Sequence, residues 1–397
     1  MRYKYLIVGG GMVAAAAMRG IREVDADGSI GVIGAEPVGP YKRPPLTKGL
    51  WKGDDTDTIW YDNQELNAGI HLGRSVLTLD TSSRTVLDDH AVEYGYERLL
   101  LATGATPKTL PFGDGVNYFR NFQDFRRLRD DVKAGRRFAV IGGGFIGSEI
   151  AAALSLNGKN VVMIFPGAGI GSHIFPEDVS HFLNGYYREK GVEIVPETTV
   201  TAIERQADQF RIGIRDNGAS ERTLEVDGVV AGIGVEPDVD LAKQAGLDVD
   251  NGVVVDEFTR TTAPDIFAAG DAAAFFNPAL GKRMRVEHED NAKTMGRVAG
   301  LNMAGQPTSY DHLPFFYSDL FDLGYEAVGE LDSRLEIMAD WKEPYEEGVV
   351  YYLNDERVRG VLLWNIWKQV DAARRLIAEP GPFSAEDLRG RLPEKRS

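Results

Sequence analysis

The sequence of 397 residues carries 44 Lys and Arg against 60 Asp and Glu, a formal net charge of -16. Because no basic run is available to neutralise phosphates, we expect no nucleic-acid partner. The absence of cysteine excludes a redox-active disulfide, a thiolate-bound iron–sulfur cluster and a cysteine nucleophile, and we predict no metal site. No apolar run reaches the ~20 residues of a membrane span, and the N-terminus enters a predicted strand at once, so we expect a cytoplasmic protein of two or three domains.

A glycine-rich loop follows the first predicted strand. Residues 5–17 read YLIVGGGMVAAAA, in which Gly9, Gly11 and Ala14 have G-x-G-x-x-A spacing. The first glycine permits a tight turn, the second lets the backbone approach a pyrophosphate, and the small third residue lets helix and strand pack closely. We expect a helix over 14–24, whose N-terminus would hold the phosphate charge, and a strand over 29–33.

Two features follow this unit. Glu36 lies ~20 residues beyond the loop, where an acidic side chain hydrogen-bonds a ribose hydroxyl; the alternative is a surface turn glutamate. Residues 39–48 then read GPYKRPPLTK, in which the Pro-Pro step stiffens the chain and projects Arg43 and Lys48 from opposite ends. A disulfide reductase would have its cysteine pair in this region, and here the chain has a lysine.

The next segment is predicted to be a β-meander that returns to the first domain. Its expected strands are 71–78, 85–87, 92–94 and 98–102. The last one ends at Thr103 and Gly104, where a small residue and a glycine allow close approach of a flavin nucleotide. Residues 114–135 have a polar helical pattern and are expected to link this domain to the next.

A second glycine-rich loop lies at 138–149, which reads FAVIGGGFIGSE. An apolar strand precedes Gly142, Gly144 and Gly147, which have G-x-G-x-x-G spacing, and an alanine-rich helix follows. One such loop can arise from packing alone. Two copies in one chain indicate two dinucleotides, as in a flavoprotein that is reduced by a nicotinamide cofactor.

The second nucleotide domain continues to residue 237. We expect a helix at 178–190 and strands at 160–165, 192–195, 200–204 and 210–214, and the domain closes with residues 228–237. The strand at 160–165 runs into Phe165, Pro166 and Gly167, where an acidic residue would normally hold the adenine ribose of NADH. His173 is the one candidate for a 2′-phosphate, so NADPH stays possible and NADH is favoured.

The chain then returns to the first domain through strands at 253–256 and 266–270. Asp271 follows the second of these, where its carboxylate can accept a hydrogen bond from a flavin ribityl hydroxyl or cap a helix. From Phe315 onward we expect an α+β domain, with strands at 325–331, 334–340, 348–353 and 357–364 and a helix at 367–377. The predicted fold is α/β, with two Rossmann-like dinucleotide-binding domains of the glutathione reductase type and a C-terminal α+β domain. The predicted domain limits are 1–110 with 236–313 for FAD, 111–235 for NAD(P), and 314–397.

These features resemble the family of apoptosis-inducing factor and the FAD-dependent ferredoxin and rubredoxin reductases over essentially the whole chain. The RPPLTK segment at 43–48 is one of the family's signatures. The third domain is more similar to apoptosis-inducing factor than to the reductases, on the residues at 286–288, 316–320, 323–329 and 360–366.

The resemblance implies that Lys48 lies beside the flavin N5 and pairs with Glu149, and that Phe145 stacks against the nicotinamide ring. A cation near N5 favours the reduced, anionic flavin, and a carboxylate partner makes the burial of the lysine tolerable. Lys48, Glu149 and His288 are the predicted catalytic residues. The predicted residues on the FAD side are Gly9, Gly11, Ala14, Glu36, Arg43, Lys48, Thr103, Gly104, Asp271, Glu287, His288 and Tyr317. Those on the NAD side are Gly142, Gly144, Phe145, Gly147, Glu149, Gly234 and Glu326.

The sequence departs from the family in two further ways. Tyr317 stands where the family commonly has tryptophan, which changes the strength of the stacking. The mitochondrial targeting segment, basic patches and long C-terminal insertion of the animal protein are missing, so we expect no DNA-binding role in cell death.

Three functions are compatible with this sequence. The favoured one is a soluble flavoenzyme that takes hydride from NAD(P)H onto FAD and passes electrons to a quinone, O2 or a small electron-carrier protein. The second is a ferredoxin or rubredoxin reductase, which the acidic charge disfavours because such carriers are themselves acidic. The third is a redox sensor, in which NAD stays on the reduced flavin in a charge-transfer complex and a homodimer forms with NADH.

Overall fold

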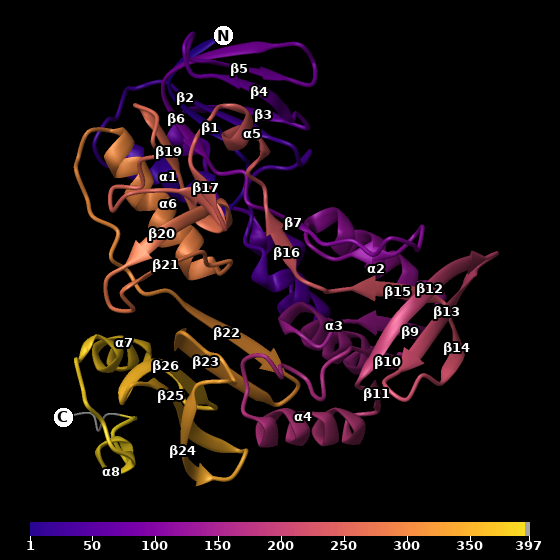
Figure 1. Ribbon diagram of the computed structural model, residues 1–397. Coiled ribbons are helices and arrows are strands. Elements are labelled where there is room, and N and C mark those ends of the chain that lie inside the picture. The colour runs from indigo at the N-terminus through magenta and orange to yellow at the C-terminus, as the bar shows by residue number, and fades with distance from the viewer. Residues whose placement is uncertain (394–397) are drawn as a thin grey trace. The chain divides into compact units, whose positions relative to one another are not determined.

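The computed structural model describes residues 1–393, and the chain divides into two compact units (Figure 1). Unit 1 comprises Met1–Arg43, Asp55–Thr106 and Glu236–Phe316. Unit 2 comprises Pro44–Asp54, Pro107–Val235 and Tyr317–Ser397. The C-terminal segment has its own sheet but belongs to unit 2. The division into three domains therefore stays a prediction.

A largely parallel sheet forms the base of unit 1, in the order β3-β2-β1-β6. The strands are β1 (Arg2–Val8), β2 (Ile30–Gly34), β3 (Ala68–Leu72) and β6 (Glu93–Leu101). Leu6 and Ile7 of β1 are fully buried although they point to opposite faces, as expected for a parallel strand that is covered on both sides.

The strand β6 has a different partner for each half. Its first half pairs antiparallel with β5 (Thr85–Asp88), which pairs with β4 (Val76–Asp80), and its second half pairs parallel with β19 (Ile266–Ala268). The predicted break between 92–94 and 98–102 is therefore wrong. Pairing with β1 from Gly95 to Leu101 keeps the strand continuous through polar residues.

The predicted strand at 71–78 is also wrong. The chain leaves β3, which is parallel to β2, and turns at Gly73 with a φ of +64° before β4 begins. Only β4, β5 and β6 form the predicted meander.

Helices α1 (Met12–Arg22) and α6 (Glu289–Met303) pack side by side (Figure 1). Glycines bring their backbones together: a Cβ on Gly300 would lie 2.2 Å from the carbonyl oxygen of Ala17, and one on Gly20 would lie 2.3 Å from that of Arg297. The sequence analysis missed α6, because small and polar residues make up much of its buried side and the apolar helical periodicity is weak.

The other elements of unit 1 are short. They are η3 (Thr56–Ile59), η4 (Gln64–Leu66), α5 (Asp240–Gln244), β17 (Val249–Asp250), β18 (Gly252–Val254), η5 (Gly270–Ala272), β20 (Ala273–Asn277) and β21 (Lys282–Met284). The strands β7 (Ala105–Pro107) and β16 (Val235–Pro237) pair with each other.

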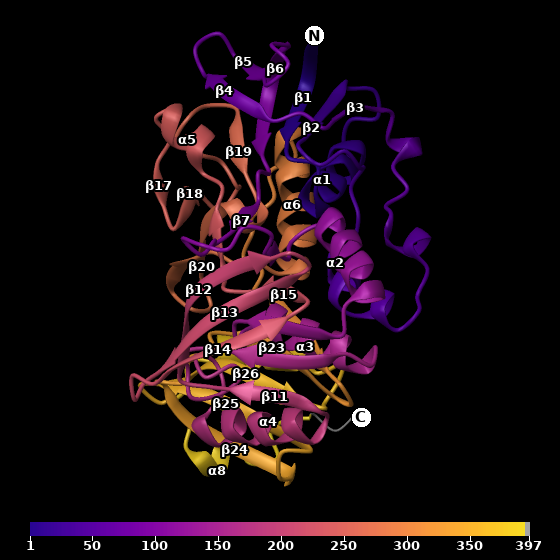
Figure 2. The same ribbon diagram turned by 90° about the vertical axis from the view of Figure 1, so that its right-hand side faces the viewer.

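Unit 2 contains a second parallel sheet, in the order β11-β10-β9-β15-β8. Its strands are β8 (Asn117–Tyr118), β9 (Arg137–Ile141), β10 (Asn160–Ile164), β11 (Val192–Val195) and β15 (Gly228–Ala231). Alternate residues of β9 and β10, such as Ile141 and Val162, face an antiparallel sheet and share its apolar core. That sheet, visible in Figures 1 and 2, consists of β12 (Thr198–Gln206), β13 (Gln209–Asp216) and the unpredicted β14 (Glu221–Val226).

Helices and two short turns complete this part of unit 2. They are η1 (Pro44–Thr47), η2 (Gly49–Trp51), α2 (Phe122–Ala134), α3 (Phe145–Leu156) and α4 (Glu177–Glu189). The predicted strand-to-helix arrangement around 138–149 is thus β9 followed by α3.

The C-terminal segment forms a five-stranded sheet in the order β22-β23-β26-β25-β24. Its elements are β22 (Phe315–Leu320), β23 (Leu323–Gly329), β24 (Glu336–Glu343), β25 (Glu347–Asn354), β26 (Arg357–Trp364), α7 (Val370–Ala378) and α8 (Ala385–Leu388). The sequence analysis did not assign β22, which carries polar residues of the site described below. Within residues 1–393, no helix has the length and apolar character needed to cross a membrane.

Gly300→Ala tests the contact between α1 and α6. The added Cβ would clash with a backbone carbonyl that cannot move without separating the helices. We expect the free energy of unfolding to fall by about 1–3 kcal/mol, as measured by urea unfolding followed by circular dichroism.

Gly185→Ala is the matched control, since Gly185 also lies in a helix but a Cβ there would meet nothing within 4 Å. Alanine should stabilise this helix by about 0.5–1 kcal/mol. Equal stability of the two variants would show that α1 and α6 do not depend on glycine for their contact.

Candidate functional site

The loop between β9 and α3 has the geometry of a phosphate cradle. Gly142 has a φ of +113°, and a Cβ on it would lie 2.3 Å from the carbonyl oxygen of Gly232. A Cβ on Gly147 would lie 2.1 Å from the carbonyl oxygen of Gly142. Gly144, the N-cap of α3, has open space around its Cβ position and no side chain caps the helix. The N–H groups of the first turn of α3 therefore fit a phosphate group.

The loop between β1 and α1 repeats this geometry. Gly9 has a φ of +122°, and a Cβ on it would lie 2.0 Å from the carbonyl oxygen of Ala102. Gly11 is the N-cap of α1, again without a side-chain cap, and Ala14 is fully buried beneath the turn. Each unit therefore has one loop that fits a dinucleotide.

Glu36 and Arg43 meet beside the first loop. The carboxylate of Glu36 accepts hydrogen bonds from Arg43 Nη2 at 2.6 Å and from the Tyr41 hydroxyl at 2.7 Å. Arg43 Nη2 also lies 4.0 Å from the Cβ position of Gly11. Burial would lower the pKa of Arg43, but Tyr41 and Glu36 outweigh it and raise that pKa. The structure thus brings together a cation, a carboxylate and the glycine loop.

Thr103 and Gly104 close the end of β6. The Thr103 hydroxyl donates to the carbonyl oxygen of Asp238 at 2.6 Å, and Gly104, with a φ of +79°, accepts from the N–H of Asp238 at 3.0 Å. These two residues are therefore tied to the returning chain.

His288 lies just before α6, near two other predicted residues of unit 1, Asp271 and Glu287. Its ring stacks on Phe316 with centroids 4.3 Å apart. Burial lowers the pKa of His288 to about 4, although Asp271 and Asp290 raise it. Asp271 lies in η5, and Glu287 pairs with Arg285 at 2.6 Å.

A buried ion pair joins Lys48 to Glu149 in unit 2. Glu149 lies in α3 with 4% of its side chain exposed, and Lys48 follows η1 with 12% exposed. Lys48 Nζ lies 2.7 Å from both carboxylate oxygens of Glu149. The Thr47 hydroxyl donates to Oε2 at 2.5 Å, and the Ser318 hydroxyl donates to Oε1 at 2.5 Å.

The strand β22 also borders this pair, through Tyr317 and Ser318. Lys48 Nζ lies 5.2 Å from the ring centroid of Tyr317, within the range of a cation–π interaction. Sequence reasoning missed Thr47 and Ser318. The available signal was that each hydroxyl residue directly adjoins a predicted site residue, Lys48 or Tyr317.

Two fully buried tyrosines lie near Glu149. The pKa of Tyr187 and that of Tyr325 are both raised well above the ordinary value, first by burial and then by the charge of Glu149. Both phenols are therefore neutral groups around an anion.

The remaining predicted residues occupy separate places. Phe145 opens α3 and is partly exposed, and Gly234 has a φ of +97°. Glu326 lies in β23 and accepts from the N–H of Lys368 at 3.2 Å; burial raises its pKa. At the end of β10, the Ser172 hydroxyl lies 2.6 Å from where a Cβ of Gly167 would be.

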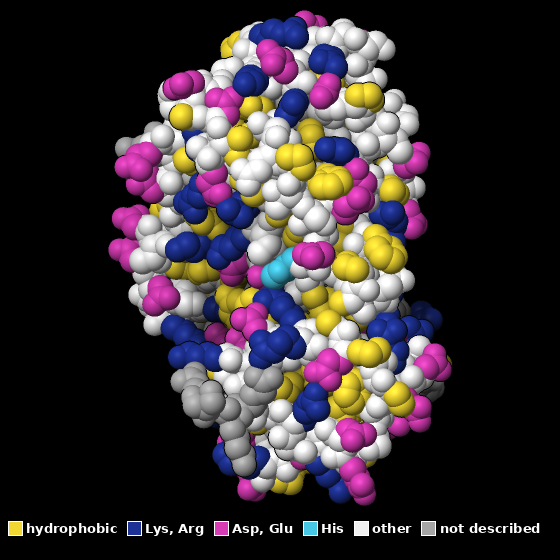
Figure 3. All heavy atoms as spheres, turned by 90° about the vertical axis from the view of Figure 1, so that its left-hand side faces the viewer, with side chains coloured by type: hydrophobic (Ala, Val, Ile, Leu, Met, Phe, Trp, Pro, Cys, Tyr) yellow, Lys and Arg dark blue, Asp and Glu magenta, His cyan; other side chains and the backbone are white. Residues whose placement is uncertain are grey.

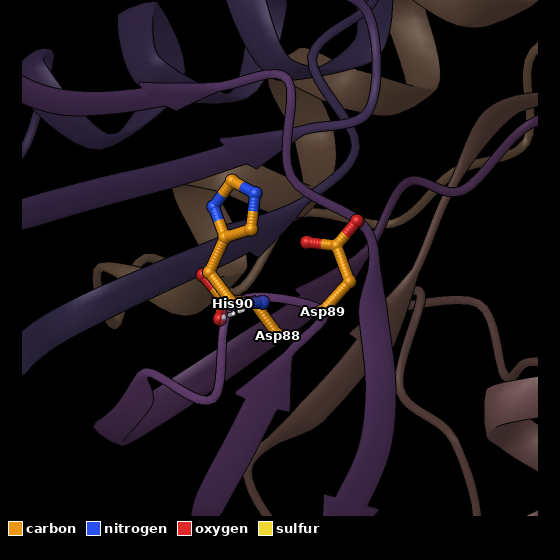
Figure 4. A group of neighbouring side chains, drawn as sticks. All are labelled: Asp88, Asp89 and His90. Atoms are coloured by element: carbon orange, nitrogen blue, oxygen red, sulfur yellow. Dashed lines mark hydrogen bonds between the residues drawn. The ribbon is translucent and has the colours of Figure 1, made fainter.

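One group of neighbouring side chains in the described part of the chain has metal-ligand spacing: Asp88, Asp89 and His90 (Figure 4). Asp88 is already satisfied, because it accepts from Arg74 at 2.7 Å and from Tyr94 at 3.0 Å. Burial would raise the pKa of Asp88, but Arg74 and nearby N–H groups hold it well below its usual range. We interpret Asp88 as a residue that stabilises the turn, because its carboxylate also accepts from the N–H groups of His90 and Val92.

Comparisons with known proteins give a consistent picture. The profile described as "Pyridine nucleotide-disulphide oxidoreductase" matches residues 3–296. The profile of the C-terminal part of mitochondrion-associated apoptosis-inducing factor matches residues 299–344 and 339–379.

Individual relatives cover nearly all of the chain. It is 36% identical to the ferredoxin–NAD(+) reductase component of an anthranilate 1,2-dioxygenase system from Burkholderia cepacia, over 94% of each chain. It is 33% identical to apoptosis-inducing factor 1 of Dictyostelium discoideum, over 95% of this chain and 78% of that one. A crystal structure of a covalent putidaredoxin reductase–putidaredoxin complex matches with a TM-score of 0.89 at 28% identity, over 97% of this chain and 95% of that one.

Glu149→Ala should expose the cost of the buried pair. It leaves the ammonium of Lys48 without its charged partner, and we expect unfolding to become easier by about 3–5 kcal/mol. Urea unfolding measures the change. Glu347→Ala is the control, because its partner Lys342 is 74% exposed and such surface pairs contribute about 1 kcal/mol or less; similar losses in both variants would contradict the role assigned to burial.

His288 should make stability depend on pH. Because the folded-state pKa of about 4 lies below the ordinary value of 6.5, the unfolded chain binds the proton first. The stability contributed by neutral His288 is present above about pH 6.5 and is lost as the pH falls toward 4. Unfolding in urea at pH 7 and pH 5 should show that His288→Gln removes about 2 kcal/mol of the difference, at 1.36 kcal/mol per pKa unit.

The control for this pH dependence is His181→Gln, at an exposed position of α4. It should leave the difference between pH 7 and pH 5 unchanged. A His288→Gln variant that keeps the full difference would remove His288 as its source.

Proposed function

The chain belongs to the pyridine nucleotide-disulphide oxidoreductase family, and we propose on that basis that the Lys48–Glu149 pair is the centre of its reaction. The protein is an FAD-dependent NAD(P)H oxidoreductase. The buried pair carries the proposal. Burying a charged lysine and glutamate costs hydration free energy, and such groups cluster at functional sites.

The glycine loops would hold the two nucleotides. The loop with Gly9 and Gly11 would hold the pyrophosphate of FAD, with Arg43 and Glu36 beside it. The loop with Gly142 and Gly144 would hold that of NAD(P)H at the N-terminus of α3. When bound, FAD accepts a hydride from the nicotinamide and can release its electrons one at a time.

Lys48 would supply a fixed positive charge in this reaction. A cation that is held in place before the reaction stabilises developing negative charge without reorganising. Glu149 binds the ammonium through both oxygens, so it keeps Lys48 from turning toward solvent. Tyr317 covers the same ammonium with its ring.

The proposed acceptor is a ferredoxin-type electron carrier. Support comes from the Burkholderia relative, which is named as a ferredoxin–NAD(+) reductase component and matches over 94% of each chain. The net charge of -16 does not rule out an acidic carrier, because basic and acidic side chains are interspersed on the face in Figure 3. The second candidate is an NADH-linked redox sensor, which the C-terminal match to apoptosis-inducing factor favours.

Lys48→Met should slow flavin reduction. Loss of the fixed charge is expected to lower the limiting rate of reduction by NADH at least tenfold, with FAD still bound. Anaerobic stopped-flow absorbance at the flavin band measures it. Lys52→Met is the matched control, four residues along and 52% exposed; an unchanged rate in Lys48→Met would remove the pair from the mechanism.

A further inference from the structure

The carboxylate of Glu149 accepts four hydrogen bonds from three residues on two separate stretches of chain. Oxygen Oε1 accepts from Lys48 and Ser318, and Oε2 accepts from Lys48 and Thr47. An ionised carboxylate has about four lone-pair positions, so the set of acceptors is filled. The lysine alone accounts for two of these bonds, and the two hydroxyls supply the rest.

The two hydroxyls fix the plane of the carboxylate. The terminal torsion of a glutamate is broad, so a carboxylate that is bound by one flexible lysine can rotate together with it. Thr47 and Ser318 bind different oxygens, and rotation in either direction would lengthen at least one short bond. Both residues are buried, with 6% and 1% exposed, so water does not replace either donor without rearrangement.

We infer that Thr47 and Ser318 are positioning residues, which hold Glu149 in the orientation that fixes the ammonium of Lys48. The inference rests on the role proposed above for the Lys48–Glu149 pair. Each hydroxyl would thus act on Lys48 through Glu149, to which both of them donate.

The orientation of Ser318 is itself controlled from the C-terminal sheet. A side-chain hydrogen bond joins Ser318 to Tyr325, whose ring stacks on Trp364 with centroids 5.8 Å apart and planes within 5°. Tyr317, the preceding residue of β22, covers Lys48. Successive residues of one strand thus act on the two members of the ion pair.

Thr47 makes the equivalent contact from the other side. Its hydroxyl also lies 3.3 Å from the carbonyl oxygen of Pro44, but the bond to Glu149 at 2.5 Å is much the shorter. The Pro-Pro step of η1 sets the backbone before Thr47 and Lys48. The stiff segment therefore positions both the Lys48 ammonium and the Thr47 hydroxyl at the Glu149 carboxylate.

Thr47→Val and Ser318→Ala test the inference in the FAD-bound protein. Each variant should lower the limiting rate of flavin reduction by NADH about tenfold with an unchanged KM, because it removes a donor to Glu149 and leaves both glycine loops as they are. The midpoint potential of the flavin should become more negative. Thr47→Ser should restore both values, since it keeps the hydroxyl.

A second readout reports on Lys48 itself. With 15N-lysine labelling, the ammonium protons of Lys48 should exchange with water several-fold faster in Thr47→Val and Ser318→Ala than in the parent protein. Ser180→Ala is the control: Ser180 is 2% exposed and donates to the carbonyl oxygen of Ile170 at 2.9 Å, far along the chain from the pair. It should change none of the three readouts.

The outcomes separate the two proposals. If Lys48→Met slows reduction but the hydroxyl variants behave like Ser180→Ala, the inference is wrong and the proposed function stands. If Lys48→Met has no effect, the function fails, and exchange at Lys48 still decides whether the hydroxyls position it. If Ser318→Ala does not fold, Tyr325→Phe replaces it and should show a smaller change in the same direction. The inference is overturned if neither Tyr325→Phe nor Thr47→Val changes the rate of reduction or the exchange at Lys48.

Discussion

The burial of Glu149 is the constraint on which the site depends. A carboxylate with 4% of its surface exposed loses several kcal/mol of hydration, and only charged or hydrogen-bonding partners restore it. Those partners come from residues 47–48 and from Ser318, more than a hundred residues away on either side. Unit 2 can therefore form this centre only when the segment at 44–54 and the C-terminal sheet are both folded against α3.

The helix α3 connects the centre to the nucleotide loop. Gly144 is its N-cap, Phe145 begins it and Glu149 lies one turn later. Residues four apart share a face of a helix, so Phe145 and Glu149 are held in a fixed relation to the N–H groups that would bind phosphate. A rigid element of this kind needs no induced movement to place a phosphate and a charged pair relative to each other.

Much of this arrangement was readable from the sequence, because the causes were local. Gly142 and Gly147 must be glycines because a Cβ at either position would clash with backbone atoms. Their spacing in the sequence was enough to predict this. The misses have non-local causes. The helix α6 buries glycine, alanine and asparagine against α1, and β6 is continuous because β1 pairs along it. Thr47 and Ser318 look like ordinary hydroxyl residues until folding brings both to one carboxylate.

Because the sequence has no cysteine, the segment that contains Lys48 cannot act as a thiol redox centre. In a disulfide reductase the chain after the first βαβ unit would carry a thiol pair that takes electrons from the flavin. Here the same stretch carries Thr47 and Lys48, which hold a charge and have no redox chemistry of their own. Electrons therefore have no thiol relay within the chain, and must pass from the reduced flavin to an acceptor that comes to it. This requirement favours the proposed small diffusing carrier over a covalent intermediate, and in the proposed mechanism the Lys48–Glu149 pair acts on the flavin only through its charge.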